Sequence, residues 1–232
     1  MLIVGETSGG REGRIQLLGM DPPYADRVDA GRQLAFALEG TAGDAIVVGL
    51  ANGGVVVAAE VARELELPLD AVAVVKVGHP AQPEYAVGAV APGVVVVRAE
   101  AELPRDELDA AVAAAVDRCE RLDAALHTHA PARELAGAAA LLVDDGLATG
   151  ATMLAAARWA RRAGAATITA CVPVAAAQSV WALRREVDAV VCPRETASLR
   201  AVAEWYRSFT PVSTEDAAAL LEAAAAADPP AP

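Results

Sequence analysis

Two adjacent carboxylates, Asp144 and Asp145, separate a hydrophobic run from a loop of small residues. The run covers residues 138–143 and has the composition of a central strand in a parallel sheet, buried on both faces. The carboxyl ends of such strands form the edge where open α/β sheets bind ligands. At that edge the two acids could accept hydrogen bonds from sugar hydroxyls or coordinate Mg²⁺ through water. The alternative without a ligand is a strand and a turn that ends in an acidic helix cap.

The loop after the acids, residues 146–152, has a composition that suits phosphate. Its residues are small or hydroxylated, so backbone amides could approach a ligand closely. A helix that begins after the loop would add unpaired N–H groups and a partial positive charge. A sugar phosphate would satisfy both the acids and this loop.

A second loop, residues 51–54, also joins an apolar strand (45–50) to a helix (55–65) and contains Gly53 and Gly54. The double glycine permits close approach of the backbone to an anion. Taken alone, the pattern equally fits an ordinary βα turn. The only lysine of the chain, Lys76, is predicted to end the next strand, 70–77, and to face the same crevice.

The segment LLVDDGLATGAT, residues 141–152, resembles the signature of the type I phosphoribosyltransferases. The resemblance implies that the two acids hold the ribose hydroxyls of phosphoribosyl pyrophosphate (PRPP), and that Mg²⁺ is bound through PRPP, with the acids reaching it through water. It assigns the 5′-phosphate to Ala148, Thr149, Gly150, Ala151 and Thr152. It assigns the pyrophosphate to Ala51, Asn52, Gly53, Gly54 and Lys76. The residues expected to act in catalysis are Asp144, Asp145 and Lys76.

Other segments resemble a bacterial subfamily of predicted phosphoribosyltransferases whose substrate is poorly defined. Its members usually have Arg-Gly-Gly where this chain has Asn52-Gly53-Gly54, and in the wider family this loop often contains a cis non-proline peptide. The departure at Asn52 predicts weaker binding of pyrophosphate. The family also has a mobile flap, expected here at about 77–92 with His79 and Glu84 in it; a surface β-hairpin is the alternative.

Three of the eight aromatic residues, Trp205, Tyr206 and Phe209, cluster near the C-terminus. In the resembled fold a small hood, here about 193–212, covers the sheet edge and binds the acceptor. Aromatic faces can stack on a planar ring. The alternative is that the three rings anchor the C-terminal helix.

The expected fold is α/β: a doubly wound, mainly parallel sheet with helices on both faces, a flexible flap and a small C-terminal hood. We expect a loose N-terminal extension (1–20), a phosphoribosyltransferase-like domain (21–212), and a C-terminal helix with a frayed tail (213–232). The expected activity is that of a glycosyltransferase that moves phosphoribosyl from PRPP to a nitrogen-containing, heterocyclic acceptor and releases pyrophosphate. A PRPP-binding regulator without activity, or a ribose-phosphate enzyme that uses water or a non-base acceptor, stays open.

The composition of the 232 residues limits the partners. A formal net charge of −12 argues against nucleic acid and anionic membranes. The sequence has no Walker motif and no Gly-x-Gly-x-x-Gly after a strand. The uncharged run 163–183 is long enough to span a bilayer, but its composition predicts a strand, a loop and the start of a helix. Three widely spaced cysteines and the lack of a signal sequence predict a cytoplasmic protein; a homodimer is left open.

Overall fold

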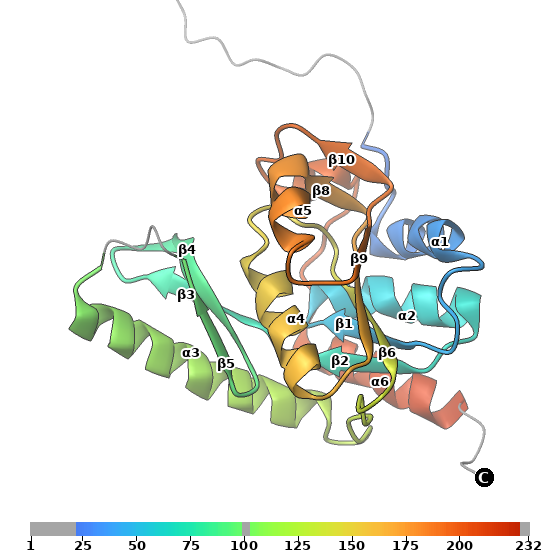
Figure 1. Cartoon of the computed structure of the whole chain (residues 1–232), viewed down its shortest axis with the longest axis horizontal. Helices are drawn as coiled ribbons and strands as arrows, with labels where there is room; N and C mark the ends of the chain where they lie inside the picture. Colours follow the sequence, from blue (N-terminus) through green and yellow to red (C-terminus); the bar gives the residue numbers. More distant parts are fainter. Residues whose placement is uncertain (1–21, 99–102, 228–232) are drawn as a thin grey trace, which may run out of the picture.

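The computed structural model describes residues 22–98 and 103–227 (Figure 1). Its centre is a sheet of five strands, and each hydrogen-bonded pair of neighbours runs parallel. The order across the sheet is β2 (Leu69–Val72), β1 (Ile46–Leu50), β6 (Ala139–Val143), β7 (Thr167–Cys171) and β9 (Ala189–Val191). The predicted mainly parallel α/β sheet is confirmed.

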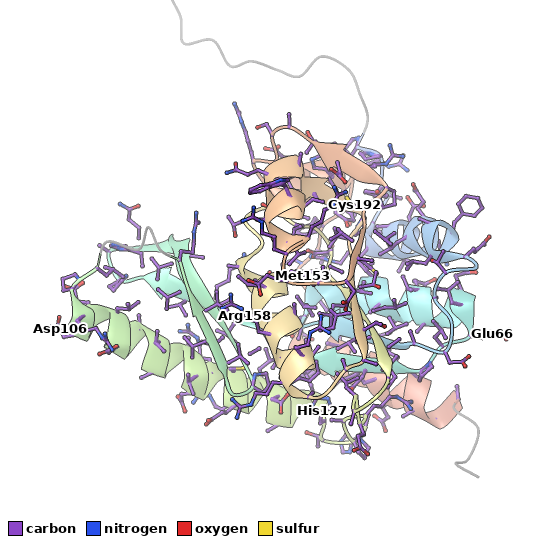
Figure 2. All side chains as sticks on the ribbon, in the orientation of Figure 1. Glu66, Asp106, His127, Met153, Arg158 and Cys192 are labelled. Carbon is purple, nitrogen blue, oxygen red and sulfur yellow. The ribbon has the colours of Figure 1, made fainter. Side chains whose placement is uncertain are left out.

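Helices cover both faces of this sheet, because successive side chains of each strand point to opposite faces. Val47 and Leu141 face a cluster with α2, whereas Val48 and Leu142 face a cluster with α4 that contains Met153 (Figure 2). The helices are α1 (Arg27–Leu38), α2 (Gly53–Leu65), α3 (Arg105–Leu126), α4 (Ala151–Arg162), α5 (Ala177–Leu183) and α6 (Thr214–Ala227). The sheet is therefore doubly wound.

The strand order reverses between β1 and β6. From β1 the chain moves to β2 on one side, and it later returns to β6 on the other side of β1. In open α/β sheets, ligands bind at such a point, outside the carboxyl ends of the two strands. The loops that meet here are residues 51–54 and 144–150, the two loops with anion-binding composition.

A second sheet corrects the predicted strand 70–77. β2 ends at Val72, and β3 (Val75–His79) belongs to an antiparallel sheet with β4 (Gln82–Ala91) and β5 (Val94–Val97). The apolar run from 69 to 77 contains no glycine or proline, so the sequence does not mark the break between the sheets. Lys76 therefore pairs with Ala89 inside β3 and does not end a strand of the central sheet.

The predicted flap, 77–92, is the β3–β4 hairpin, the arrangement left open as the alternative. Val77, Val87 and Val90 are fully or almost fully buried, and the hairpin contacts α3 and α4 (Figure 1). Its base is thus part of the hydrophobic core.

The region of the predicted hood is built on a two-stranded parallel sheet, β8 (Val174–Ala176) with β10 (Arg194–Thr196), and a 3₁₀ helix (Val202–Trp205). The uncharged run 163–183 forms β7, β8 and α5. The strand and the helix start agree with the prediction, and the short strand β8 lies where a loop was predicted. Among the helices of the described chain, none is long and apolar enough to cross a membrane. The predicted extension 1–20 and tail 228–232 lie outside the described residues.

One buried acid, Asp70, ties β2 to the end of α3. Its Oδ2 accepts a hydrogen bond from the Arg133 amide at 2.8 Å, and its Oδ1 lies 3.2 Å from Nε2 of His127. Figure 2 shows Asp106 and His127 at opposite ends of α3, so the contact fixes the far end of this long helix. Since Nδ1 of His127 lies 3.0 Å from the Asp123 carbonyl oxygen, only the imidazolium can donate to both partners. The hydrogen bond to Asp70 raises the pKa of His127.

We predict that His127→Gln destabilises the fold more at acidic than at alkaline pH. A raised pKa in the folded state means that the stabilisation is complete below the unfolded value, about 6.5, and is lost as the pH rises through the folded value. At acidic pH the variant should lose about 1.5–3 kcal/mol of unfolding free energy, the contribution of a hydrogen bond to a charged group. Urea unfolding at pH 5.5 and pH 9 measures it, with the exposed His129→Gln as control. An equal loss at both pH values would contradict the ion pair.

Candidate functional site

The two acids lie side by side just past the end of β6. The Asp144 amide donates to the Cys171 carbonyl oxygen at 3.3 Å, and the Asp145 amide donates to Oδ1 of Asp144 at 2.9 Å. Thr152 at the start of α4 donates to Oδ2 of Asp144 at 3.5 Å. Burial raises the pKa of Asp144 well above its ordinary range, and the negative charge of Asp145 raises it further. The loop thus holds a carboxylate in a place that disfavours its charge.

Asp145 has a cationic partner that Asp144 lacks. Nε of Arg27, the first residue of α1, donates to Oδ2 of Asp145 at 2.8 Å. Burial raises the pKa of Asp145, and the Arg27 guanidinium opposes this rise. The hydroxyl of Tyr206 donates to the main-chain oxygen of Asp145 at 2.6 Å. Both backbone and side chain of this acid are therefore fixed from outside its own loop.

The loop after the acids is hydrogen-bonded to the neighbouring β8 and α5. The Leu147 amide donates to the Val174 carbonyl at 2.9 Å, and Ser179 Oγ donates to the Ala148 carbonyl at 2.5 Å. Gly150, at φ +81°, then turns the chain into α4. The first N–H groups of a helix have no partner within it, so α4 presents the expected anion-binding end. The structure thus brings residues 148–152 beside the acids, as predicted.

The loop 51–54 lies against the acidic loop. A Cβ atom on Gly54 would be 2.7 Å from the Val143 carbonyl oxygen, so only glycine permits this approach. The Ala51–Asn52 peptide bond is cis, as the resemblance led us to expect. α2 begins at Gly53, so a second helix N-terminus opens on the crevice.

The side chain of Asn52 is bonded to the segment that begins α6. Its Nδ2 donates to the Val212 carbonyl oxygen at 3.2 Å and to Oγ1 of Thr214 at 3.4 Å. The amide therefore ties the loop to the start of α6. Its Oδ1 is buried and, among the described residues, has no hydrogen-bond partner. What the loop can offer a ligand is its backbone.

The charge of Lys76 acts on both acids, although this residue belongs to the second sheet. Its side chain is exposed, and its positive charge lowers the pKa of both Asp144 and Asp145. His79 lies at the hairpin tip, where Nδ1 accepts a hydrogen bond from the Ala81 amide at 3.1 Å. For Glu84 the structure describes only the backbone, in β4.

The aromatic cluster forms the contact between the hood and α1. Tyr206 is 4 % exposed, and its ring centroid lies 5.3 Å from that of Tyr24 and 5.0 Å from that of Phe209. Because its ring is enclosed and its hydroxyl is bonded to Asp145, Tyr206 does not fit the predicted stacking on an acceptor. Trp205 and Phe209 are only half-buried.

Arg27 is the member of the site that sequence reasoning missed. Besides Asp145, it contacts the Thr210 carbonyl oxygen through Nη1 at 2.8 Å and lies over the Phe209 ring at 3.7 Å. The sequence offers no motif around Arg27, and the nearby Arg32 has the same residue type on the same helix. Only the fold shows that Arg27 points into the site.

The acids suit a metal whose other ligands come from elsewhere. Within residues 22–98 and 103–227, no group of three His, Cys, Asp or Glu could hold an ion by itself. Mg²⁺ commonly binds through one or two carboxylates together with substrate phosphates and water. Asp144 and Asp145 fit this role.

The chain is similar to known proteins in sequence and in fold. The profile of the phosphoribosyl transferase domain matches residues 25–205, most of the chain. The chain belongs to the phosphoribosyl transferase family. Two curated relatives from Mycobacterium tuberculosis strains, provisionally named phosphoribosyl transferases, are each 40 % identical over 224 residues; the matches cover 89 % of this chain and 51 % of each relative. The chain thus spans about half the length of these curated relatives.

A solved structure supports the assignment over the whole domain. The crystal structure of TT1426 from Thermus thermophilus is 36 % identical, with a TM-score of 0.73, over 87 % of this chain and 99 % of that one. The two chains therefore share one fold over most of their length.

We predict that Asp144→Asn stabilises this phosphoribosyl transferase fold at neutral pH. Because the pKa of Asp144 is raised in the folded state, the fold favours the protonated carboxyl group. The protein therefore loses stability as Asp144 ionises with rising pH. Asparagine stays neutral, so the variant should gain on the parent between pH 4 and pH 7. Each kcal/mol gained should raise Tm by about 2–4 °C.

Thermal unfolding across this pH range measures the gain, with the exposed Asp109→Asn as the matched control. A lower Tm for Asp144→Asn than for the parent at pH 7 would contradict the conclusion that burial disfavours the charge of Asp144.

Proposed function

We propose that this protein transfers the phosphoribosyl group of PRPP to a nitrogen-containing heterocyclic acceptor and releases pyrophosphate. The single observation that carries the proposal is the meeting of the acids and the two glycine-containing loops at the crevice between β1 and β6. One crevice there combines acceptors for sugar hydroxyls with two helix N-termini for phosphate groups. PRPP has these groups in the same combination.

In this proposal the loop of residues 148–152 binds the 5′-phosphate, and the acids bind the ribose hydroxyls. Gly150 and the start of α4 direct backbone N–H groups to the phosphate. Asp144 and Asp145 accept hydrogen bonds from the hydroxyls in their ionised form. The Arg27 ion pair favours the ionised form of Asp145, and the charge of Lys76 favours the ionised form of both acids.

Bond cleavage in this site would rest on electrostatic stabilisation. As the bond from C1 of the ribose to pyrophosphate breaks, positive charge develops on the ring and negative charge on the leaving group. The acids oppose the first charge, and the backbone amides of Gly53 and Gly54 with Lys76 oppose the second. Mg²⁺, bound through PRPP and reached by the acids, would supply further positive charge to the pyrophosphate.

The acceptor would bind under the hood, beside Trp205 and Phe209. Both rings are half-buried and pack against the cluster that contains Tyr206, whose hydroxyl is bonded to the acidic loop. Tyr206 would act by holding Asp145 in place. The hairpin tip with His79 and Glu84 is the part of the chain that could cover the bound substrate.

The second candidate is a PRPP-binding regulator without turnover. Asn52 favours it, because this side chain is bonded to Val212 and Thr214 and brings no charge to the leaving group. Incubation with PRPP, Mg²⁺ and a panel of purines, pyrimidines and other ring acceptors separates the two. Release of pyrophosphate that depends on one acceptor supports transfer, whereas binding of PRPP with no release for any acceptor supports the regulator.

We predict that the double variant Asp144→Asn, Asp145→Asn loses PRPP binding and keeps its fold. Each lost charged hydrogen bond should cost about 1.5–3 kcal/mol, which is at least tenfold in affinity per acid. Calorimetric titration with Mg²⁺ and PRPP measures the loss, and Asp106→Asn with Asp109→Asn on α3 is the control pair. Unchanged affinity in the double variant of the site would remove the ribose role.

We predict that Lys76→Ala lowers turnover at least about tenfold, the effect of losing one charged hydrogen bond. It should also move the acidic limb of the pH–rate profile to higher pH. Lys76 lowers the pKa of both acids, so its removal raises these values and delays their ionisation. Arg105→Ala, an exposed cation on α3, is the control. Turnover and profile that match the parent would place the pyrophosphate site elsewhere.

A further inference from the structure

The side chain of Arg27 joins four segments of the site. Its guanidinium is bonded to Asp145 in the acidic loop and to the Thr210 carbonyl oxygen in the hood, and it packs on Phe209. A Cβ atom on Gly53 would lie 3.0 Å from its Nε and 3.1 Å from its Nη2. The guanidinium therefore lies directly against the first residue of α2, in the second anion-binding loop.

Arg27 has donors that the protein does not use. A guanidinium has five N–H groups, and the described part of the chain receives one hydrogen bond from Nε and one from Nη1. Nη2 has no partner within residues 22–98 and 103–227. The side chain is nevertheless only 10 % exposed. A guanidinium that is largely enclosed but has donors left over can form strong, charge-assisted hydrogen bonds to an anionic ligand.

The neighbouring loop lacks a cation of its own. Residues 51–54 contain no basic side chain, and the Asn52 amide is turned toward α6. The loop offers only backbone N–H groups at the start of α2, beside the Arg27 guanidinium. A ligand with several negative charges needs more than these neutral donors, since charged hydrogen bonds are about twice as strong.

We propose that Arg27 binds the pyrophosphate group of PRPP through Nη2, while its Nε stays on Asp145. This inference rests on the proposed function and adds a residue to it. One guanidinium then contacts the acid at the ribose and the departing group together. Binding of the two halves of the substrate is thereby coupled, and α1 supplies the charge that the loop 51–54 does not contain.

The rival explanation is that Arg27 only positions Asp145. The two explanations differ in which half of PRPP depends on Arg27. If Arg27 only positions the acid, its loss weakens binding of the ribose end. If it binds pyrophosphate, its loss weakens the other end, and ribose 5-phosphate, which lacks pyrophosphate, serves as an internal reference.

The experiment is a calorimetric titration of the parent, Arg27→Gln and Arg27→Lys with Mg²⁺ and either pyrophosphate, PRPP or ribose 5-phosphate. For Arg27→Gln we expect about tenfold weaker binding of pyrophosphate and PRPP, which corresponds to about 1.4 kcal/mol, and unchanged binding of ribose 5-phosphate. Arg27→Lys keeps the charge but loses the planar fork, so it should recover part of the loss. Arg32→Gln, an exposed arginine paired with Glu60 on the same side of α1 and α2, is the control.

Each contrary result has a separate meaning. Equal weakening of pyrophosphate and ribose 5-phosphate, or unchanged binding of pyrophosphate, overturns the role of Arg27 and leaves the proposed function standing. A parent protein that binds neither PRPP nor ribose 5-phosphate overturns the proposed function itself. If thermal unfolding shows that Arg27→Gln does not fold, Arg27→Lys decides, because the same preferential loss of pyrophosphate binding is expected from it.

Discussion

Two neighbouring carboxylates lie at a buried sheet edge, where their negative charge is disfavoured. Burial raises the pKa of both acids, and their mutual repulsion adds to the effect at Asp144. The cations that oppose this, Arg27 and Lys76, come from α1 and from the second sheet. The rest of the fold therefore has to hold α1 and the second sheet close to the acidic loop.

Two contacts between segments that are distant in the sequence hold the acidic loop in place. The reversal of strand order puts the loops after β1 and β6 next to each other, and Gly54 lets them touch. Tyr206 then ties the hood to the main chain of Asp145. These contacts join the loop after β1, the acidic loop and the hood into one packed unit.

Much of this could be predicted from the sequence because the strands of the central sheet are apolar runs followed by residues with distinct chemistry. The acids, the phosphate loop and the double glycine follow such runs directly. The break between β2 and β3 could not be predicted, since no glycine or proline between 69 and 77 interrupts the pattern. The direction of the Asn52 amide, the hydrogen bond of Tyr206 and the approach of Arg27 depend on contacts with residues 160, 61 and 118 positions away. Local sequence carries no signal for contacts of this kind.

The central claim is that one crevice binds both ends of a phosphoribosyl pyrophosphate molecule. A crystal structure of the protein with Mg²⁺ and PRPP tests it most directly. The account predicts the 5′-phosphate on residues 148–152, the ribose hydroxyls on Asp144 and Asp145, and the pyrophosphate between Gly53, Gly54 and Arg27. A pyrophosphate group bound away from the loop 51–54, or a ribose that does not contact the acids, would contradict it.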